Sequence, residues 1–362
     1  MKANQKLYDL GQSLWIDHIT RDLLNSGMLK HYIEELSVTG LTSNPAIFGY
    51  TVKNSSAYDA AIRKKLKGNK SGEELFLELA LEDLCQAADL FRPIYDQTDG
   101  MEGWVSMEVS PRLTQDTDSA VAAVKDLYTR ARRPNIFIKI PGTREGLPAV
   151  EEAIFAGVPV NVTFLFSREH YLAAAEAYLR GVERRIAAGL KPNVGSVASL
   201  FVNCWDVAVT GMVPDALHNQ LGIAVARRTY KACRELVRSP RWKRAYNAGA
   251  RPQRLLWAGT ESKDPMASDV FYINALAAPL TVNCMLESTL KAFADHGDFG
   301  TSMPADGGDC EAVLNRFAKA GIDIDDLAAQ LQDDGTAVFI KSWIEVMSEI
   351  ASKSAALVQS QW

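Results

Sequence analysis

Hydrophobic positions recur along the chain in a two-part unit. A short run rich in β-branched and apolar residues is followed by a longer amphipathic stretch, which is typical of βα units around a parallel sheet. The pattern predicts eight strands, at residues 14–19, 38–43, 105–110, 135–140, 159–166, 196–203, 254–260 and 280–285. Eight strands that alternate with helices indicate an α/β fold with a closed parallel barrel.

The stretches between the strands have helical periodicity. In residues 168–189, Tyr171, Ala174, Ala175 and Tyr178 fall at positions i, i+3, i+4 and i+7, which places them on one face of an amphipathic helix. Such a face is expected to pack against the barrel.

Two further segments are predicted to be helical additions to the barrel. We expect extra helices after the second strand, from about residue 50 to 100, and a helical C-terminal extension from about residue 308 onward. No linker, low-complexity tract or internal repeat marks a boundary between independent units. Residues 1–362 are therefore predicted to form one domain.

Composition narrows the classes of partner. The chain has 362 residues, 39 basic and 44 acidic side chains, and a formal charge of -5, so it lacks the basic surface that attracts nucleic acid. No apolar run approaches the roughly 20 residues of a membrane span, and the first residues lack the apolar core of a secretion signal. The odd set of widely spaced cysteines predicts a reducing cytoplasm and no zinc site; these are Cys85, Cys204, Cys233, Cys284 and Cys310.

The fourth predicted strand carries a lysine. Functional side chains in such barrels lie at the C-terminal ends of the strands and in the loops that follow. Alternation puts Lys139 on the same side as Phe137, opposite Ile136, Ile138 and Ile140. Burial lowers the pKa of a lysine and yields the amine that attacks a carbonyl to form a Schiff base. The alternative is a structural lysine, paired with a carboxylate or reaching the rim of the barrel.

Two carboxylates occur in comparable positions on other strands. Asp17 lies in the first predicted strand and Glu108 in the third, although acidic residues are rare in strands. A lysine that cleaves a C–C bond through an iminium needs a base for the hydroxyl proton and a second acid/base for imine formation. Asp17 and Glu108 fit these roles. The alternative is that one or both only neutralise Lys139.

Uncharged polar side chains near strand ends complete the candidate site. Amides and hydroxyls there suit a substrate with several hydroxyl groups. Taken singly, each also fits a turn former or a satisfied buried group. The candidates are Thr42, Ser43, Asn44, Asn161, Thr163, Ser199 and Asn283.

Six segments together resemble the motifs of the transaldolase family, in the family's order and over nearly the whole chain. They are LTSNPAIF (41–48), SMEVSPRL (106–113), IKIPGT (138–143), VNVTFLFS (160–167), SVAS (196–199) and TLKAFADHG (289–297). The resemblance implies a class I aldolase TIM barrel that transfers dihydroxyacetone to an aldose acceptor. The implied donor is a ketose phosphate of the pentose phosphate pathway, such as sedoheptulose 7-phosphate or fructose 6-phosphate. It implies no metal or organic cofactor, and a homodimer.

The resemblance also assigns roles to the reactive side chains. Lys139 matches the Schiff-base lysine, and Asp17 matches the aspartate that handles the proton in C–C cleavage. Glu108, acting through a water held with Thr163, matches the proton shuttle of imine formation. The two readings of Lys139, from strand burial and from the family, agree.

The same resemblance implies a set of substrate-binding residues. Most of them match positions that hold the hydroxyls of bound dihydroxyacetone, while an aromatic residue lines the pocket. The hydroxyl-binding residues are Asn44, Asn161 and Ser199, with Thr42 in support, and the aromatic residue is Phe201.

Three loops depart from the family pattern where the substrate phosphate is expected. After the sixth strand, Cys204 replaces the arginine that holds the phosphate, and a cysteine cannot supply a charged, bidentate clamp. After the seventh strand, Lys263 remains as a phosphate ligand, but Glu261 adds a negative charge beside it. After the eighth strand, Leu286 replaces a proline.

These departures leave two substrate readings open. One is the ordinary phosphosugar reaction, with Arg144, Arg168 or Lys263 compensating for the lost arginine. The other is a specialised paralogue that acts on a different or non-phosphorylated substrate in a biosynthetic pathway.

Other classes of function are weaker. A catalytically silent barrel that binds a partner is disfavoured because the reactive residues are retained. A metal-dependent aldolase is disfavoured because the histidines show no ligand spacing; they are His18, His31, His170, His218 and His296. Cys204 and Cys284 are either space-filling side chains or a redox or nucleophilic pair.

Overall fold

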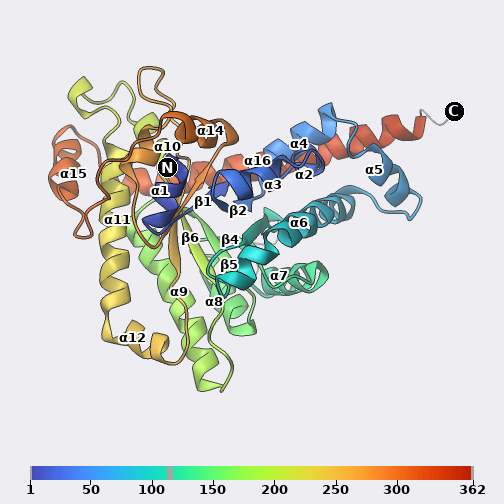
Figure 1. Ribbon diagram of the computed structural model, residues 1–362, viewed down its shortest axis with the longest axis horizontal. Helices are drawn as coiled ribbons and strands as arrows, with labels where there is room; N and C mark the ends of the chain where they lie inside the picture. The colour runs from blue at the N-terminus through green and yellow to red at the C-terminus, as the bar shows by residue number, and fades with distance from the viewer. Residues whose placement is uncertain (1, 112–116, 360–362) are drawn as a thin grey trace.

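The eight predicted strands form a closed parallel barrel within residues 2–111 and 117–359, which the computed structural model describes (Figure 1). Each strand pairs with its neighbours in sequence, and the last pairs with the first. The predicted α/β barrel is therefore confirmed. The strands are β1 (Gln12–Ile16), β2 (Val38–Thr42), β3 (Trp104–Glu108), β4 (Ile136–Pro141), β5 (Val160–Leu165), β6 (Ser196–Phe201), β7 (Arg254–Ala258) and β8 (Thr281–Met285).

Helices surround the barrel and cover the outer face of the sheet (Figure 1). The predicted apolar face of residues 168–189 is buried, which confirms that amphipathic helix. The surrounding helices are α1 (Ala3–Asp9), α2 (Arg21–Asn25), α3 (Met28–Glu35), α7 (Thr117–Ala131), α8 (Leu147–Ala156), α9 (Arg168–Ala187), α10 (Asn203–Ala208), η2 (Asp215–Leu217), α11 (Leu221–Arg238), α12 (Pro240–Asn247), α13 (Phe271–Ala275) and α14 (Glu287–His296).

The two predicted helical additions are present and pack against each other. The segment after β2 forms α4 (Pro45–Asn54), α5 (Asp59–Leu66) and α6 (Gly72–Gln97), and the C-terminal extension forms α15 (Cys310–Lys319) and α16 (Ile324–Gln359). Figure 1 shows α16 running along α4 away from the barrel. An aromatic cluster joins them, in which Phe76 meets Trp343 edge to face at 4.9 Å.

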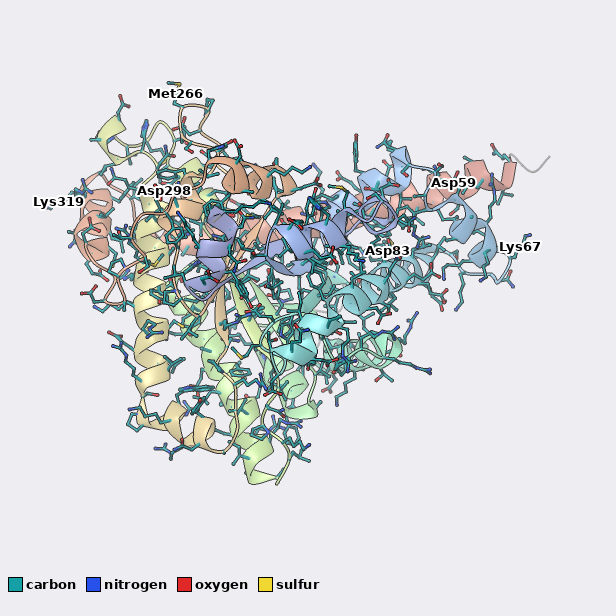
Figure 2. The ribbon with its side chains drawn as sticks, viewed as in Figure 1. Asp59, Lys67, Asp83, Met266, Asp298 and Lys319 are labelled. Carbon is teal, nitrogen blue, oxygen red and sulfur yellow. The ribbon has the colours of Figure 1, made fainter. Side chains whose placement is uncertain are left out.

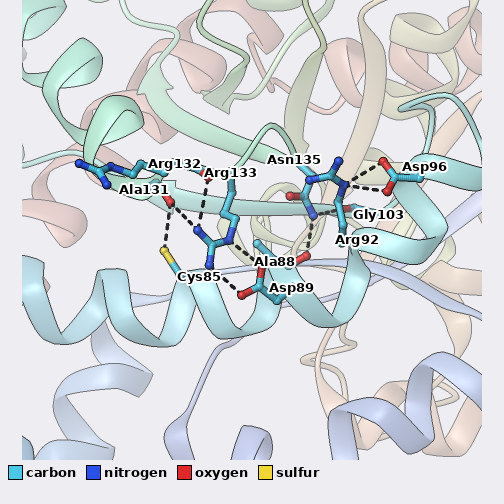
Figure 3. Close-up of polar contacts among 10 residues, drawn as sticks. All are labelled: Cys85, Ala88, Asp89, Arg92, Asp96, Gly103, Ala131, Arg132, Arg133 and Asn135. Carbon is cyan, nitrogen blue, oxygen red and sulfur yellow. Dashed lines mark hydrogen bonds and ion pairs between the residues drawn. The ribbon is translucent and has the colours of Figure 1, made fainter.

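Buried polar contacts tie the long helix α6 to the elements around it. Asp83, labelled in Figure 2, accepts hydrogen bonds from Arg21 at 2.9 Å and from Tyr58 at 2.6 Å. Figure 3 shows that Asn135, just before β4, donates to the carbonyl oxygens of Ala88 and Gly103. These bonds tie the N-terminal end of β4 to α6 and to the residue before β3.

Side chains alternate between the two faces of β4 as predicted. Ile136, Ile138 and Ile140 pack in the layer between sheet and helices, whereas Phe137 points into the barrel. Phe137 stacks on Trp104 with ring centroids 4.0 Å apart. Because Lys139 lies two residues beyond Phe137 on the same side, this aromatic layer forms the floor beneath the lysine.

The N-terminal end of the barrel is closed by a buried ion pair. Arg254 Nη1, at the start of β7, lies 2.9 Å from Glu102 Oε1 and also donates to Ser13 Oγ at 2.7 Å. The opposite end, where the strands finish, is left for the polar side chains described below.

Candidate active site

Lys139 and Glu108 form an ion pair near the C-terminal ends of adjacent strands. β3 and β4 pair in register with Glu108 beside Lys139, and Lys139 Nζ lies 2.8 Å from Glu108 Oε1. The ammonium also donates to the carbonyl oxygen of Ser43 at 2.9 Å. Both side chains are close to nine-tenths buried, with 10% and 13% of their surface exposed. The structure therefore brings together two residues that the sequence predicted separately.

Asp17 is the second carboxylate of this cluster. It follows β1 directly, rather than lying within the strand as predicted, and its amide continues the ladder by bonding Met285 O. Thr42 Oγ1, at the end of β2, donates to Asp17 Oδ1 at 2.8 Å. The Asp17 charge also interacts with Lys139. Thr42 thus orients a carboxylate that shares one ammonium with Glu108.

The charge of this cluster differs from the sequence prediction. Burial lowers the pKa of Lys139 as expected, but the carboxylates of Glu108 and Asp17 outweigh burial and hold the pKa above its usual value. The predicted net lowering is therefore wrong. Burial raises the pKa of both Asp17 and Glu108, and the Lys139 ammonium opposes the rise. The structure favours an ammonium whose nearest proton acceptor is Glu108.

A row of uncharged polar side chains lies beside the ion pair. Asn161 on β5 is in register with Lys139 and donates from Nδ2 to Ser106 Oγ at 3.1 Å. Ser199 on β6 donates to Asn161 Oδ1 at 2.7 Å. Ser106 was missed by sequence reasoning, although it is two positions before Glu108 and therefore faces the same side of β3.

Thr163 and Phe201 lie at the ends of β5 and β6. Thr163 is buried two positions beyond Asn161 and next to Pro141 in the register. Phe201 stacks on Phe164 with nearly parallel rings 5.8 Å apart. These residues extend the polar row into an aromatic wall at the barrel mouth.

Two predicted polar candidates have other roles in the structure. Asn44 accepts the Ala46 amide and caps α4 ahead of Pro45, so its side-chain oxygen serves the turn while the residue stays near Glu108. Asn283 is not at the mouth, because Val282 and Cys284 on either side of it face the barrel interior. Asn283 therefore faces the surrounding helices, which corrects its prediction as a substrate ligand.

Cys204 and Lys263 lie together at the edge of the mouth. They line a cavity of about 900 Å³ between α10 and the start of α16. Burial raises the pKa of Cys204 to about 12, so its thiol is neutral at pH 7. Lys263 Nζ lies 2.9 Å from Glu261 Oε1. The residues expected at the phosphate end of the substrate thus comprise a neutral thiol and a lysine already paired.

The two arginines predicted as alternative phosphate ligands show no contact with the reactive cluster among the described residues. Arg168 Nε donates to Glu169 at 2.8 Å, and Arg144 is exposed. All cysteines are free thiols, so Cys204 and Cys284 form no disulfide. The end of the SMEVSPRL motif, residues 112–113, lies outside the described residues.

The C-terminal extension reaches the mouth, a placement that the sequence left open. Gln332 on α16 donates to Phe164 O at 2.8 Å and to Gly142 O at 3.4 Å. A Cβ at Gly335 would approach the rings of Phe164 and Phe166 to 3.1–3.3 Å, so the small residue permits close packing. α16 therefore lies against the residue that follows β4 and against the end of β5.

The described residues form neither a metal-ligand cluster nor a membrane-spanning helix. Across residues 2–111 and 117–359, no three His, Cys, Asp or Glu side chains gather as metal ligands would. Within the same ranges, no helix combines the length and apolarity of a bilayer span.

Sequence comparisons match this chain over nearly its full length. The family model described as Transaldolase/Fructose-6-phosphate aldolase matches residues 14–350. A transaldolase of Thermobifida fusca is 40% identical over 361 residues, covering 97% of this chain and 98% of the relative. A transaldolase of Saccharopolyspora erythraea is 40% identical over 353 residues, and one of Trichodesmium erythraeum is 36% identical over 366 residues. Each of these two alignments covers 96% of both chains.

Proposed function

The chain belongs to the transaldolase/fructose-6-phosphate aldolase family, and from this premise we propose that it is a transaldolase. It transfers a dihydroxyacetone unit from a ketose to an aldose acceptor through a Schiff base on Lys139. Sedoheptulose 7-phosphate and fructose 6-phosphate, donors in the pentose phosphate pathway, are the default substrates. The observation that carries the proposal is a buried lysine 2.8 Å from Glu108, with the charge of Asp17 acting on it and a row of neutral hydrogen-bonding groups alongside.

Imine formation begins with a proton transfer inside the ion pair. Lys139 passes a proton to Glu108, which leaves a neutral amine and a carboxylic acid whose raised pKa favours that form. The amine attacks the ketose carbonyl, and Glu108 returns a proton to the departing hydroxyl as the carbinolamine loses water. Thr163 is proposed to help hold the water that relays this proton.

C–C cleavage then uses the second carboxylate. Asp17 accepts the proton of the C4 hydroxyl, the C3–C4 bond breaks, and its electrons move toward the iminium nitrogen. An aldehyde leaves and a dihydroxyacetone enamine remains on Lys139. The reverse steps attach this unit to the acceptor aldehyde. Thr42 keeps the Asp17 carboxylate oriented through its 2.8 Å hydrogen bond.

The neutral polar groups are proposed to hold the three-carbon unit. Asn161 and Ser199, which bond each other in the free protein, would instead form hydrogen bonds with the hydroxyls of dihydroxyacetone. Asn44 would bind from the side of Glu108. Ser106 is a positioning residue, because it bonds Asn161. Phe201 lines the pocket, and Cys204 and Lys263 lie where the far end of the sugar extends.

A second candidate function is the same chemistry on a sugar without a phosphate. The observation that favours it is the ion pair between Lys263 and Glu261. Lys263 is the cation expected to bind the phosphate, and in this pair it is already neutralised by a carboxylate. The neutral Cys204 thiol adds no charge there.

We also propose a setting for the enzyme. It would work in the cytoplasm as a homodimer on small sugar substrates, with no nucleic-acid partner. The modest negative charge of the chain and the family relationship support these expectations.

Borohydride trapping tests the proposed function. The protein is incubated with fructose 6-phosphate or fructose, reduced, and analysed by intact mass and peptide mapping. We expect a dihydroxyacetone adduct on Lys139, and none in Lys139→Met, because methionine keeps the length of the side chain but has no amine. The exposed Lys30→Met is the matched control and should retain the adduct. An adduct or transfer activity in Lys139→Met would refute the mechanism.

A further inference from the structure

The loop after β7, described over residues 259–270, contains one lysine, Lys263. Its ammonium forms an ion pair with Glu261 of the same loop. Glu261 Oε1 lies 2.9 Å from Lys263 Nζ, although more than half of the lysine side chain is exposed. Asn203, at the start of α10, donates to the backbone oxygen of Glu261 at 3.1 Å. The backbone of Glu261 is thus tied to α10, while its carboxylate pairs with a lysine of the same loop.

Glu261 is paired with Lys263, which lines the large cavity, and its charge also reaches the reactive cluster. The charge of Glu261 raises the pKa of Asp17 and Cys284, and also that of Cys204, which lines the cavity. A substrate joined to Lys139 and extending toward the cavity would therefore come under the charge of this carboxylate.

The cavity itself is acidic. Asp326 and Asp334 of α16 and Asp323, just before this helix, contribute carboxylates, and Lys263 is the cation among the described residues that line it. The facing wall, from α10 and the residues after it, is largely apolar, with Val207 and Val209. A dianionic phosphate entering here would meet like charges and would compete with Glu261 for Lys263.

We propose that Glu261 is a specificity-determining residue that weakens recognition of the phosphate carried by the aldose part of the substrate. It pairs with Lys263 and adds its own negative charge beside the path of the substrate. The site should therefore accept sugars with or without a phosphate, and the phosphate should add little to binding. This inference rests on the proposed transaldolase function.

A competition between two acceptors tests the inference. The enzyme receives fructose 6-phosphate as donor with equal concentrations of D-erythrose 4-phosphate and D-erythrose. Mass spectrometry then measures the ratio of sedoheptulose 7-phosphate to sedoheptulose. In such a mixture, the product ratio reports the ratio of the two kcat/KM values. The donor step and the ionisation of Asp17 are common to both acceptors and cancel.

Glu261→Gln should raise this ratio about tenfold, the effect of one additional charged hydrogen bond of about 1.4 kcal/mol to the phosphate. The matched control is Glu152→Gln, which removes a carboxylate paired with Arg184 on the outer helices and should leave the ratio unchanged. Adding Lys263→Ala to Glu261→Gln should abolish the gain, because the released lysine is the phosphate ligand.

A ratio that stays within twofold in Glu261→Gln would overturn the inference, as would a gain that persists in Glu261→Gln/Lys263→Ala. The borohydride adduct on Lys139 separates this failure from that of the proposed function. An adduct with an unchanged ratio refutes only the role of Glu261, whereas no adduct and no product refute both.

Discussion

Two buried ion pairs lie at opposite ends of the same barrel. Near the C-terminal ends of the strands, Lys139 and Glu108 are 2.8 Å apart with 10% and 13% of their side chains exposed. Near the N-terminal ends, Arg254 and Glu102 are 2.9 Å apart with 7% and 11% exposed. By distance and burial alone, the two pairs are nearly the same.

Their surroundings differ in a way that separates structure from chemistry. Arg254 also bonds Ser13 and the carbonyl oxygen of Met101, and a guanidinium does not give up its proton in a protein. Lys139 instead shares its charge with a second carboxylate, Asp17, and an amine can exchange its proton. A surplus acid and an ionisable cation, rather than a buried ion pair as such, distinguish the reactive end.

Removing the surplus acid should have the largest effect on turnover. Asp17→Asn is expected to lower kcat by about 100-fold to 10,000-fold, because the C4 hydroxyl loses its base. A borohydride adduct on Lys139 should still form, because imine formation uses Lys139 and Glu108, but it should carry the mass of the whole ketose rather than that of dihydroxyacetone. Steady-state kinetics and trapping are measured side by side, with the exposed Asp295→Asn as control. A kcat within tenfold of the original enzyme would contradict the role of Asp17.

Breaking the pair at the other end should instead cost stability. Arg254→Met leaves the buried Glu102 carboxylate without its cation, and we expect the free energy of unfolding in urea to fall by about 3–5 kcal/mol. Lys139→Met should cost less, because the raised pKa of Glu108 eases its neutralisation by a proton.

The double variant Arg254→Met/Glu102→Gln serves as the control for this prediction. It should recover part of the loss, because the unpaired charge is gone. Equal losses for Arg254→Met and Lys139→Met would remove the distinction between the two ends. The kcat per folded molecule should change only in Lys139→Met.

The strands and the reactive residues were predictable because they depend on local pattern. Period-two alternation placed Lys139 on the inner face with Phe137, and the structure agrees. The same alternation also indicates that Asn283 faces away from the interior, since its neighbours Val282 and Cys284 face inward. Its position near a strand end is therefore not enough to predict a substrate ligand; the side of the strand that it faces decides.

The pairing of charges was not predictable in the same way. Arg254 and Glu102 are 152 residues apart, and only closure of the barrel brings them together. Likewise, burial of Lys139 could be inferred from its strand, but its pKa depends on the register between β3 and β4 and on the position of Asp17. The path of α16 over the mouth depends on packing between segments far apart in sequence, such as Gln332 against Phe164.

The smallest predicted effect concerns the ionisation of Asp17. The Thr42 hydrogen bond stabilises the carboxylate and lowers its pKa, while burial, the largest influence, raises it. Thr42→Val removes that bond, so the pKa should rise further. Because the base must be ionised, the acid limb of the kcat/KM profile should move to higher pH, by less than about one unit.

Thr39→Val is the matched control for this shift, because Thr39 is a buried threonine of the same strand whose Oγ1 has no hydrogen-bond partner among the described residues. Its profile should coincide with that of the unmodified enzyme. Glu261→Gln should move the acid limb the opposite way, since it removes a negative charge that raises the pKa of Asp17. If Thr42→Val moved the limb to lower pH, or left it in place, Asp17 would not be the group that titrates there.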